Sequence, residues 1–276
     1  MPVAVKPTSK APRALTVAGS DSSGGAGLQA DLATFAALGV FGASAVTAVT
    51  VQDTRRVRAV HVMPPSVVAA QVETVLEDLG ASAVKTGMLC NRAIVEAVAR
   101  VLAAARARNL VIDPVIRSTS GAELLDRAGL KALCDSLLPL ARVVTPNLSE
   151  ASTLAGIEVV DFESVDEAAR LILRLGPATV VITGGHLSGD PVDVVADRRG
   201  VRRLAGQRIG HGAHGTGCVF SAAIAAHLAR GRGIDEAVRG AKRFVEDRLR
   251  RAVRLGGGER LFDLRAGPTA SRASRR

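Results

Sequence analysis

The chain has 276 residues and a formal net charge of +10, and 47% of its residues are hydrophobic. This length fits one large α/β domain better than two small ones, and the apolar share is ample for a core. Only 2% of the residues are aromatic, with no Trp or Tyr, so the core has to be aliphatic. Many basic residues are scattered over helix faces or lie near the two ends, with no aromatic residues between them, which argues against a nucleic-acid surface. A positive field also suits an anionic substrate.

The cysteines and the N-terminal residues bear on where the protein works. Three cysteines lie far apart without metal-like spacing, and their odd number argues against a disulfide framework: Cys90, Cys134 and Cys218. This usage is typical of a reducing cytoplasm. Residues 1–13 contain no apolar segment of the kind found in a signal peptide. The uncharged stretch Leu32–Gln52 is interrupted by Gly39 and Gly42, so it predicts a helix end, a loop and a strand rather than a membrane span.

Apolar runs alternate with amphipathic helical segments along most of the chain. In chain order the predicted elements are a strand over Ala14–Ala18, a helix over Ala26–Leu38, a strand over Ala43–Val51, a helix over Ser66–Leu79, a strand over Ala83–Thr86, a helix over Arg92–Arg108, a strand over Leu110–Val115, a helix over Glu123–Leu138, a strand over Arg142–Thr145, a helix over Asn147–Leu154, a helix up to Leu175, a strand over Thr179–Thr183, a hairpin of Val192–Ala196 and Val201–Leu204, and helices over Gly217–Arg230 and Ile234–Ala252. A capping box of Ser164 and Glu167 is expected to start the helix that ends at Leu175.

This alternation predicts a three-layer α/β/α fold, in which a mostly parallel sheet is covered by helices on both faces. Residues 13–264 are expected to form one domain, and residues 1–12 and 265–276 are expected to be disordered tails.

The most informative stretch is His214-Gly215-Thr216-Gly217-Cys218, which comes directly before an apolar helical run. The first backbone N–H groups of a helix have no partner within the helix, and the helix dipole adds partial positive charge, so this place suits an anion. Positive potential would lower the pKa of the Cys218 thiol and make it a candidate base or nucleophile. A glycine turn with a small core cysteine is the structural alternative.

Polar residues also follow the predicted strands. In a parallel sheet, ligands gather at the carboxyl ends of the strands, so these segments are expected to meet at one edge. They are Gly19–Gly27, Gln52–Asp53, Lys85–Leu89, Asp113–Val115, Thr145–Glu150 and Gly184–His186. The first of them is neither a dinucleotide-binding fingerprint nor a phosphate loop of the GKS or GKT type.

Together and in this order, the segments resemble the hydroxymethylpyrimidine/phosphomethylpyrimidine kinases of thiamine biosynthesis, which have the ribokinase-like fold. The matching strings are GSDSSGGAGLQADL (Gly19–Leu32), TAVTVQDT (Thr47–Thr54), VKTGML (Val84–Leu89), DPV (Asp113–Val115), TPNLSEA (Thr145–Ala151), GGH (Gly184–His186) and HGTGC (His214–Cys218). The resemblance extends from about Leu15 to Phe262. Sugar kinases of the same fold carry Gly-Ala-Gly-Asp where this chain has Gly-Thr-Gly-Cys.

The resemblance implies an ATP-dependent phosphotransferase that phosphorylates 4-amino-5-hydroxymethyl-2-methylpyrimidine and then its monophosphate. It assigns Cys218 as the base that takes the proton of the substrate hydroxyl, and the amides of Gly215, Thr216, Gly217 and Cys218 as the group that stabilises the migrating phosphoryl. It places six residues around the substrate ring: Gln52, Gly19, Asp21, Asp31, Met88 and Val115. For Met88 and Val115 a plain core role stays open, and for Asp31 a solvated position on the first helix.

At the nucleotide the resemblance implies Mg²⁺, held partly through water by Asp113, Asn147 and Glu150, with Thr183 and Gly185 near the phosphates. Mg²⁺ keeps much of its hydration, which suits such a set. A helix start is the alternative role of Asn147 and Glu150. The resemblance also implies a homodimer, with small molecules as ligands and neither nucleic acid nor membrane as a partner.

Two positions depart from the family pattern, because Thr119 and Thr183 stand where the family usually carries lysines. Both lysines would neutralise phosphate charge, and Arg117 or Lys85 could take their place. Two alternatives therefore stay open: a pyridoxal kinase, which acts on a similar hydroxymethyl group, and a pyrimidine-binding module without catalysis.

Overall fold

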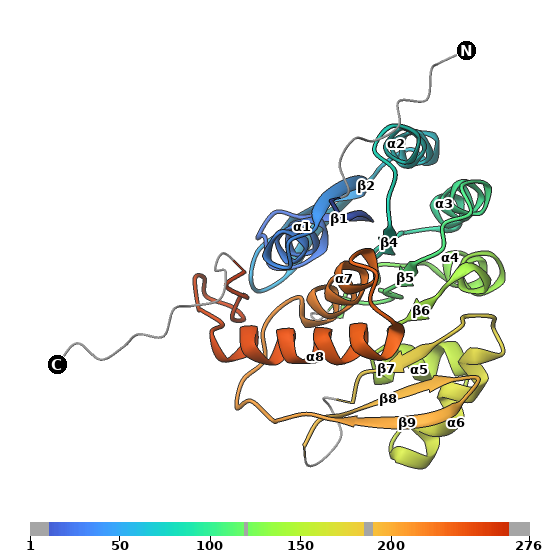
Figure 1. Ribbon diagram of the computed structural model, residues 1–276. Coiled ribbons are helices and arrows are strands. Elements are labelled where there is room, and N and C mark those ends of the chain that lie inside the picture. The colour runs from blue at the N-terminus through green and yellow to red at the C-terminus, as the bar shows by residue number, and fades with distance from the viewer. Residues whose placement is uncertain (1–10, 119–120, 185–189, 265–276) are drawn as a thin grey trace.

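The computed structural model describes residues 11–118, 121–184 and 190–264 (Figure 1). The strands are β1 (Arg13–Asp21), β2 (Phe41–Gln52), β3 (Val57–Val62), β4 (Ala83–Thr86), β5 (Leu110–Ile112), β6 (Val143–Val144), β7 (Val180–Ile182), β8 (Val192–Asp197) and β9 (Gly200–Ala205). The helices are α1 (Gly27–Ala37), α2 (Pro65–Asp78), α3 (Arg92–Ala104), α4 (Arg127–Ala132), α5 (Leu148–Ala155), α6 (Phe162–Leu173), α7 (Thr216–Ala229) and α8 (Ile234–Arg250). Of the two predicted tails, residues 1–10 and 265–276 lie outside the described residues.

The strands form one sheet in the order β3-β2-β1-β4-β5-β6-β7-β8-β9. Neighbours from β2 to β7 run parallel, whereas β3 is antiparallel to β2 at one edge. At the other edge β8 is antiparallel to β7, and β8 and β9 form the predicted hairpin. The mostly parallel sheet predicted from the alternation of elements is therefore confirmed.

Helices cover both faces of the sheet, as predicted. On one face α1, α7 and α8 pack together, and α2 to α6 lie on the other (Figure 1). Every residue of α7 from Val219 to Ala229 is buried, because this helix lies between the sheet and its two neighbours α1 and α8. No helix in the described part of the chain is both long and apolar enough to cross a membrane.

The sheet order places a change of direction between β1 and β4. The chain moves from β1 outward to β2, and later returns to add β4 on the other side of β1. Such a switch leaves a crevice at the carboxyl ends of the two strands, where the connections part in opposite directions. Gly19 at the end of β1 and Gly87 after β4 lie at this point, so the fold opens a site where polar segments were predicted to meet.

Four details of the predicted elements are wrong. No strand was predicted over Val57–Val62, although this segment contains three valines. In the structure it forms β3, which pairs with β2. The strand predicted up to Val115 ends at Ile112, because the chain turns at Pro114, and the Val115 amide donates to the Asp113 carbonyl.

The other two differences concern helix starts. The helix expected from Glu123 begins at Arg127 behind the N-cap Asp126, because Ala122–Leu125 pairs with Ile116–Ser118 in a short flap. The capping box of α6 is formed by Asp161 and Ser164, one turn before the predicted pair, because Asp161 accepts from the Ser164 amide.

Candidate active site

A cavity of about 810 Å³ opens at the carboxyl ends of the parallel strands. That volume is large enough for a small ring and a nucleotide together, since ligand pockets commonly range over roughly 300–1,000 Å³. Most of the predicted site residues line it: Gly19, Asp21, Gln52, Met88, Asp113, Val115, Asn147, Glu150, Thr183, Gly215, Thr216, Gly217 and Cys218. Gly185 lies outside the described residues, as does Thr119. The meeting of the first five predicted segments at one edge of the sheet is confirmed, whereas Gly184–His186 lies largely outside the described residues and stays a prediction.

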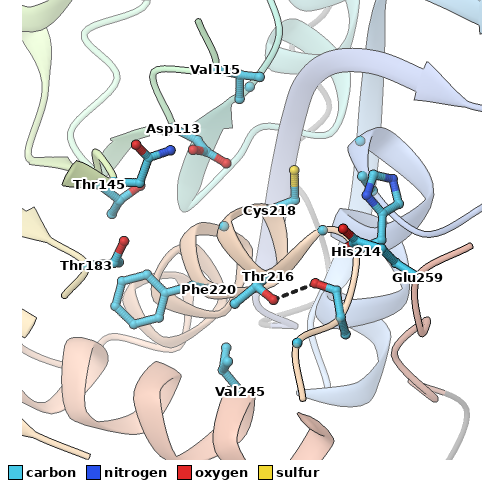
Figure 2. A pocket seen from close by; sticks show the side chains of 18 of the residues that line it. Asp113, Val115, Thr145, Thr183, His214, Thr216, Cys218, Phe220, Val245 and Glu259 are labelled. Atoms are coloured by element: carbon cyan, nitrogen blue, oxygen red, sulfur yellow. Dashed lines mark hydrogen bonds between the residues drawn. The ribbon is translucent and has the colours of Figure 1, made fainter. Parts of the chain in front are cut away.

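The start of α7 forms a cradle of backbone amides on the cavity wall. Gly215 precedes the helix with φ of 80°, a left-handed conformation that favours glycine, and a Cβ there would lie 2.0 Å from the Gly25 carbonyl oxygen. No side chain caps this end of α7, so its first amides are available to an anion. The Thr216 hydroxyl does not face the cradle as a free donor, because it donates to the Ala213 carbonyl at 2.7 Å (Figure 2).

Cys218 projects from this helix start into the cavity, with Asp113 on one side and His214 on the other (Figure 2). The prediction of a lowered thiol pKa is wrong for the free protein. Burial raises the pKa of Cys218 to about 12; Lys85 opposes this shift, but the carboxylates of Asp113 and Asp31 add to it. Burial of the thiol is therefore the main reason that the positive potential of the helix start does not lower its pKa.

A buried cluster of charges lies behind the cradle. The Lys85 Nζ atom on β4 is fully buried and lies 2.8 Å from Asp31 Oδ2 and 3.8 Å from Asp113 Oδ2. Burial lowers the pKa of Lys85, but the carboxylates around it raise it well above its ordinary value. Its charge is therefore balanced within the protein, and Lys85 does not replace a free phosphate-binding lysine.

Asp31 does not lie where the sequence reading placed it. It is fully buried, accepts from the Thr16 hydroxyl at 2.6 Å and from Lys85, and does not line the cavity. Both the contact with the substrate ring and the solvated alternative are therefore wrong. Asp31 faces inward from α1, and its carboxylate balances the charge of Lys85.

Asn147 and Glu150 form the capping box at the start of α5. The Asn147 side chain accepts from the Glu150 amide, and the Glu150 carboxylate accepts from the Asn147 amide, each at 2.9 Å. The helix-start role is thus present, and both residues also line the cavity. Burial and, to a smaller extent, repulsion from Asp113 raise the pKa of Glu150 to about 8.

The side chains near Asp113 provide a place that suits a hard cation. Burial raises the pKa of both Asp113 and Glu150, and the Asp113 charge raises that of Glu150 as well, so a cation near the pair would relieve repulsion. Within the described ranges, no cluster of three or more His, Cys, Asp or Glu residues is arranged to hold a metal. The protein thus offers few ligands of its own, which fits a Mg²⁺ ion that keeps waters and binds phosphate oxygens.

The wall opposite Asp113 carries hydrogen-bonding groups for a ring. Gln52 at the end of β2 lies 3.0 Å from His214, measured between their Nε2 atoms, and His214 Nε2 lies 3.2 Å from Asp21 Oδ2. Met88 packs so close to Gly19 that a Cβ there would lie 3.0 Å from its sulfur. Met88 is 8% exposed, and this exposed part lines the cavity.

The opposite end of the cavity is apolar and lies near α8. Figure 2 shows Thr183, Phe220 and Val245 grouped on the side of α7 away from His214. The adjoining polar pair is Lys242 and Asp193, whose Nζ and Oδ2 atoms are 2.8 Å apart. This end suits a flat aromatic base with its phosphates directed at the cradle.

Two functional residues were not predicted individually. His214 is the first residue of the cradle motif, and no separate role was predicted for it. In the structure it contacts both Asp21 and Gln52. Lys85 was considered only as a phosphate ligand, whereas it is the cation of the buried cluster. A polar residue inside an otherwise apolar strand, Ala83–Thr86, was the available signal for Lys85.

Comparison with known proteins agrees with this geometry. The chain matches the phosphomethylpyrimidine kinase family over residues 21–263. It is 45% identical over 248 residues to a hydroxymethylpyrimidine/phosphomethylpyrimidine kinase of Streptomyces coelicolor, covering 90% of this chain and 92% of that protein. It is 46% identical to the thiamine biosynthesis bifunctional protein ThiED of Geobacter sulfurreducens, covering 88% of this chain but only 50% of that longer protein. An ADP complex of Bacillus subtilis pyridoxal kinase superposes with a TM-score of 0.86 at 38% identity, covering 92% and 97% of the two chains.

The fold, the amide cradle and these relatives together define a kinase that phosphorylates a small molecule. More narrowly, the chain belongs to the phosphomethylpyrimidine kinase family.

Proposed function

We propose that the protein transfers the γ-phosphoryl group of ATP to the hydroxymethyl group of 4-amino-5-hydroxymethyl-2-methylpyrimidine, and then to the resulting monophosphate. One observation supports this most: a single cavity joins the Gln52 wall, the amide cradle with Cys218, and the apolar end beside α8. A ring at the first place and a nucleotide at the last would bring the hydroxyl and the γ-phosphate together at the cradle. Such positioning and charge neutralisation provide most of the catalysis of phosphoryl transfer.

In the first step the bond between the substrate oxygen and the γ-phosphorus forms while the bond to the ADP oxygen breaks. Cys218 would take the hydroxyl proton, and the amides of Gly215 to Cys218 would stabilise the charge on the moving phosphoryl group. In the second step the attacking phosphate oxygen is already anionic, so no base is needed. The two steps therefore place different demands on Cys218.

Mg²⁺ would be held near Asp113 and Glu150, where it would neutralise phosphate charge. Asn147 would contribute through water, because its side-chain oxygen already accepts from the Glu150 amide. Arg117 on the flap lines the same cavity and is exposed, so it is the cation best placed to approach phosphate oxygens.

Pyridoxal phosphorylation is the second candidate, supported by the superposition on the Bacillus subtilis pyridoxal kinase. The absence of Trp and Tyr from the sequence and the carboxamide of Gln52 favour the aminopyrimidine. The test is an ADP-release assay with the pyrimidine alcohol, its monophosphate and pyridoxal side by side. Turnover of both pyrimidines supports the proposal. Turnover of pyridoxal alone overturns the choice of substrate, and tight pyrimidine binding without ADP release would indicate a binding module.

Homodimer formation and a cytoplasmic location remain part of the proposal. Exposed valines on the edge strand β3 and on its neighbour β2 support self-association: Val49, Val51, Val60 and Val62. Light scattering on the purified protein tests it, and a monomer at micromolar concentration contradicts it.

A further inference from the structure

His214 lies at the substrate end of the cavity, between a carboxylate and a carboxamide. Its side chain is 14% exposed, and its Nε2 atom faces both Asp21 Oδ2 at 3.2 Å and Gln52 Nε2 at 3.0 Å. The ring has little freedom, because a Cβ on Gly25 would lie 2.6 Å from its Cδ2 atom. The backbone is fixed as well, since the His214 amide donates to the Arg260 carbonyl at 2.8 Å.

Asp21 decides which nitrogen of His214 carries the proton. Its carboxylate accepts from the Ser23 amide at 2.8 Å and from the Ala26 amide at 2.9 Å, and from the Ser23 hydroxyl. Burial alone would raise the pKa of Asp21, but the hydrogen bonds from His214 and Ser23 bring it below its ordinary value. Asp21 is therefore an acceptor only, and the His214 Nε2 atom must be the donor.

This proton in turn decides the orientation of the Gln52 carboxamide. An amide NH₂ group beside the His214 Nε2–H would place two donors against each other. The carboxamide turned by 180° removes the conflict, because its oxygen then accepts from His214. The Gln52 nitrogen then takes the position 3.2 Å from the Thr50 hydroxyl oxygen. This hydroxyl donates its own hydrogen to the Ser20 carbonyl at 2.9 Å, so its oxygen can accept from the Gln52 amide. The single hydrogen on His214 Nε2 then faces two acceptors, Asp21 Oδ2 and the Gln52 oxygen, in a three-centre hydrogen bond, and no two donors face each other.

The orientation matters because a carboxamide that rotates freely recognises opposite patterns equally well. A 4-aminopyrimidine offers a donor on C4 and an acceptor at the neighbouring ring nitrogen, and the 4-oxo ring offers the reverse. Gln52 with its oxygen held toward His214 matches only the amino pattern. On the ring, the carbon that carries the hydroxymethyl group is next to the C4 amine, on the side opposite the ring nitrogen. With the amine at the Gln52 oxygen, on the side of His214, the hydroxyl is therefore directed toward Gly215 and Cys218.

We propose that His214, through its contact with Asp21, is a positioning residue that fixes the Gln52 carboxamide and makes the site select an amino-substituted ring over its oxo counterpart. The inference rests on the proposed function, because it takes Gln52 as the contact for the pyrimidine edge. It adds a determinant of specificity that neither the cradle nor the nucleotide end of the cavity supplies.

The matched variants are His214→Gln and His214→Met. Glutamine keeps an N–H donor near the position of Nε2, whereas methionine has a similar size and no donor. Calorimetry measures the dissociation constants of both rings, 4-amino-5-hydroxymethyl-2-methylpyrimidine and its 4-oxo analogue, without nucleotide. Calorimetry suits a chain that has no Trp or Tyr to report binding by fluorescence.

The wild-type protein is expected to bind the amino ring at least about thirtyfold more tightly than the oxo ring. His214→Met is expected to bring this ratio below about threefold, with the oxo ring bound more tightly than by wild type, because the carboxamide is free to turn. His214→Gln is expected to keep the wild-type ratio within about threefold. General damage to the site would weaken both rings, and does not explain a gain of binding by the oxo ring.

An unchanged ratio in His214→Met, or an equal loss for both rings, overturns the inference. A wild-type protein that binds neither ring overturns it as well. A wild-type protein that binds the amino ring selectively but releases no ADP overturns the proposed function alone, and the binding ratios of the variants still decide the inference.

Discussion

The two ends of the central cavity treat buried charge in opposite ways. Beside Asp113 and Glu150, burial raises the pKa of both carboxyl groups, the Asp113 charge raises that of Glu150 as well, and burial raises the pKa of Cys218 to about 12. At the Gln52 wall, Asp21 is also buried, yet its pKa is lowered, because hydrogen bonds surround its carboxylate. In the free protein, the charged forms of Asp113 and Glu150 are therefore destabilised, whereas the carboxylate of Asp21 is already stabilised by hydrogen bonds.

This difference indicates what each end does. A site that waits for a cation and phosphates keeps buried carboxyl groups with raised pKa values, and a bound cation would stabilise their charged forms. A site that selects a neutral ring needs fixed donors and acceptors, so its hydrogen bonds are satisfied before the ligand arrives. The following predictions test the comparison, beginning with the largest expected effect.

Removal of the thiol should have the largest effect. We expect Cys218→Ala to reduce the rate of alcohol phosphorylation by about 10²–10⁴, the usual contribution of a positioned base. Phosphorylation of the monophosphate should fall by less than about tenfold, because its attacking oxygen is already anionic. Steady-state assays with the two substrates measure this. Equal losses in both steps would show that Cys218 is not the base.

The raised thiol pKa fixes the direction of the pH dependence. A base with a pKa of about 12 is mostly protonated at neutral pH, so its active fraction grows as the pH rises. We therefore expect alcohol phosphorylation to increase from pH 6.5 to pH 9 (about tenfold per unit at most), while the second step changes little over that range. A decrease of the first rate over this range would contradict the prediction.

The buried cation should have the next largest effect, on stability. Lys85→Met leaves Asp31 and Asp113 without their common partner, and breaking a buried ion pair in this way typically costs about 3–5 kcal/mol of unfolding free energy. Urea denaturation measures it. Replacing Asp31 by leucine in the same chain should restore part of the loss. A single variant within about 1 kcal/mol of wild type would show that Lys85 does not hold the cluster together.

These charges also mark how far the sequence could predict the site. The cradle, Gln52 and Asn147 lie in contiguous strings at the ends of predicted strands, so local pattern was enough to bring them to one edge. The partner of Asp31 could not be predicted in that way, because Lys85 lies on another strand, and Asp113, the other carboxylate near Lys85, follows a third. The thiol pKa is raised mainly by burial, with smaller contributions from the distant carboxylates, so the helix start alone predicted the wrong direction.

The fold was predictable to a similar degree. Alternating strands and helices gave the parallel sheet and its two covered faces, because that periodicity is local. The antiparallel edge strand β3 was missed, since two of its three valines, Val60 and Val62, are exposed and the exposed His61 lies between them. The helix expected from Glu123 begins later, at Arg127, because Ala122–Leu125 pairs with Ile116–Ser118. No local sequence pattern reveals this pairing.

Neutralising Glu150 should raise stability and lower activity. Its pKa of about 8 lies above the ordinary value of 4.5, so the folded state binds more protons than the unfolded chain between these values. The free energy of unfolding therefore falls as the pH rises through this window. We expect Glu150→Gln to be more stable than wild type at pH 8, by on the order of 2 kcal/mol, with no such gain at pH 4.5.

Thermal unfolding at the two pH values measures this effect, with the exposed Glu77→Gln as the matched control. The same variant should raise the Mg²⁺ concentration needed for half-maximal rate. A gain in stability that is independent of pH would show that the carboxyl group of Glu150 is not strained in the free protein.

The smallest effect is expected where the chain lacks a family lysine. Thr183 pairs with Asn147 in an isolated β-bridge and lines the cavity. A lysine at this position would therefore extend toward the acidic end of the cavity, which is formed by Asp113 and Glu150. We expect Thr183→Lys to lower the KM for ATP by about threefold, because an added cation offsets the charge of the phosphates. Thr183→Met has a similar length without the charge, and should leave the KM unchanged or raise it. If both variants have the same KM for ATP, the acidic end is already neutralised when ATP binds. The lysine that this chain lacks would then be replaced by another cation, for which Arg117 is the first candidate.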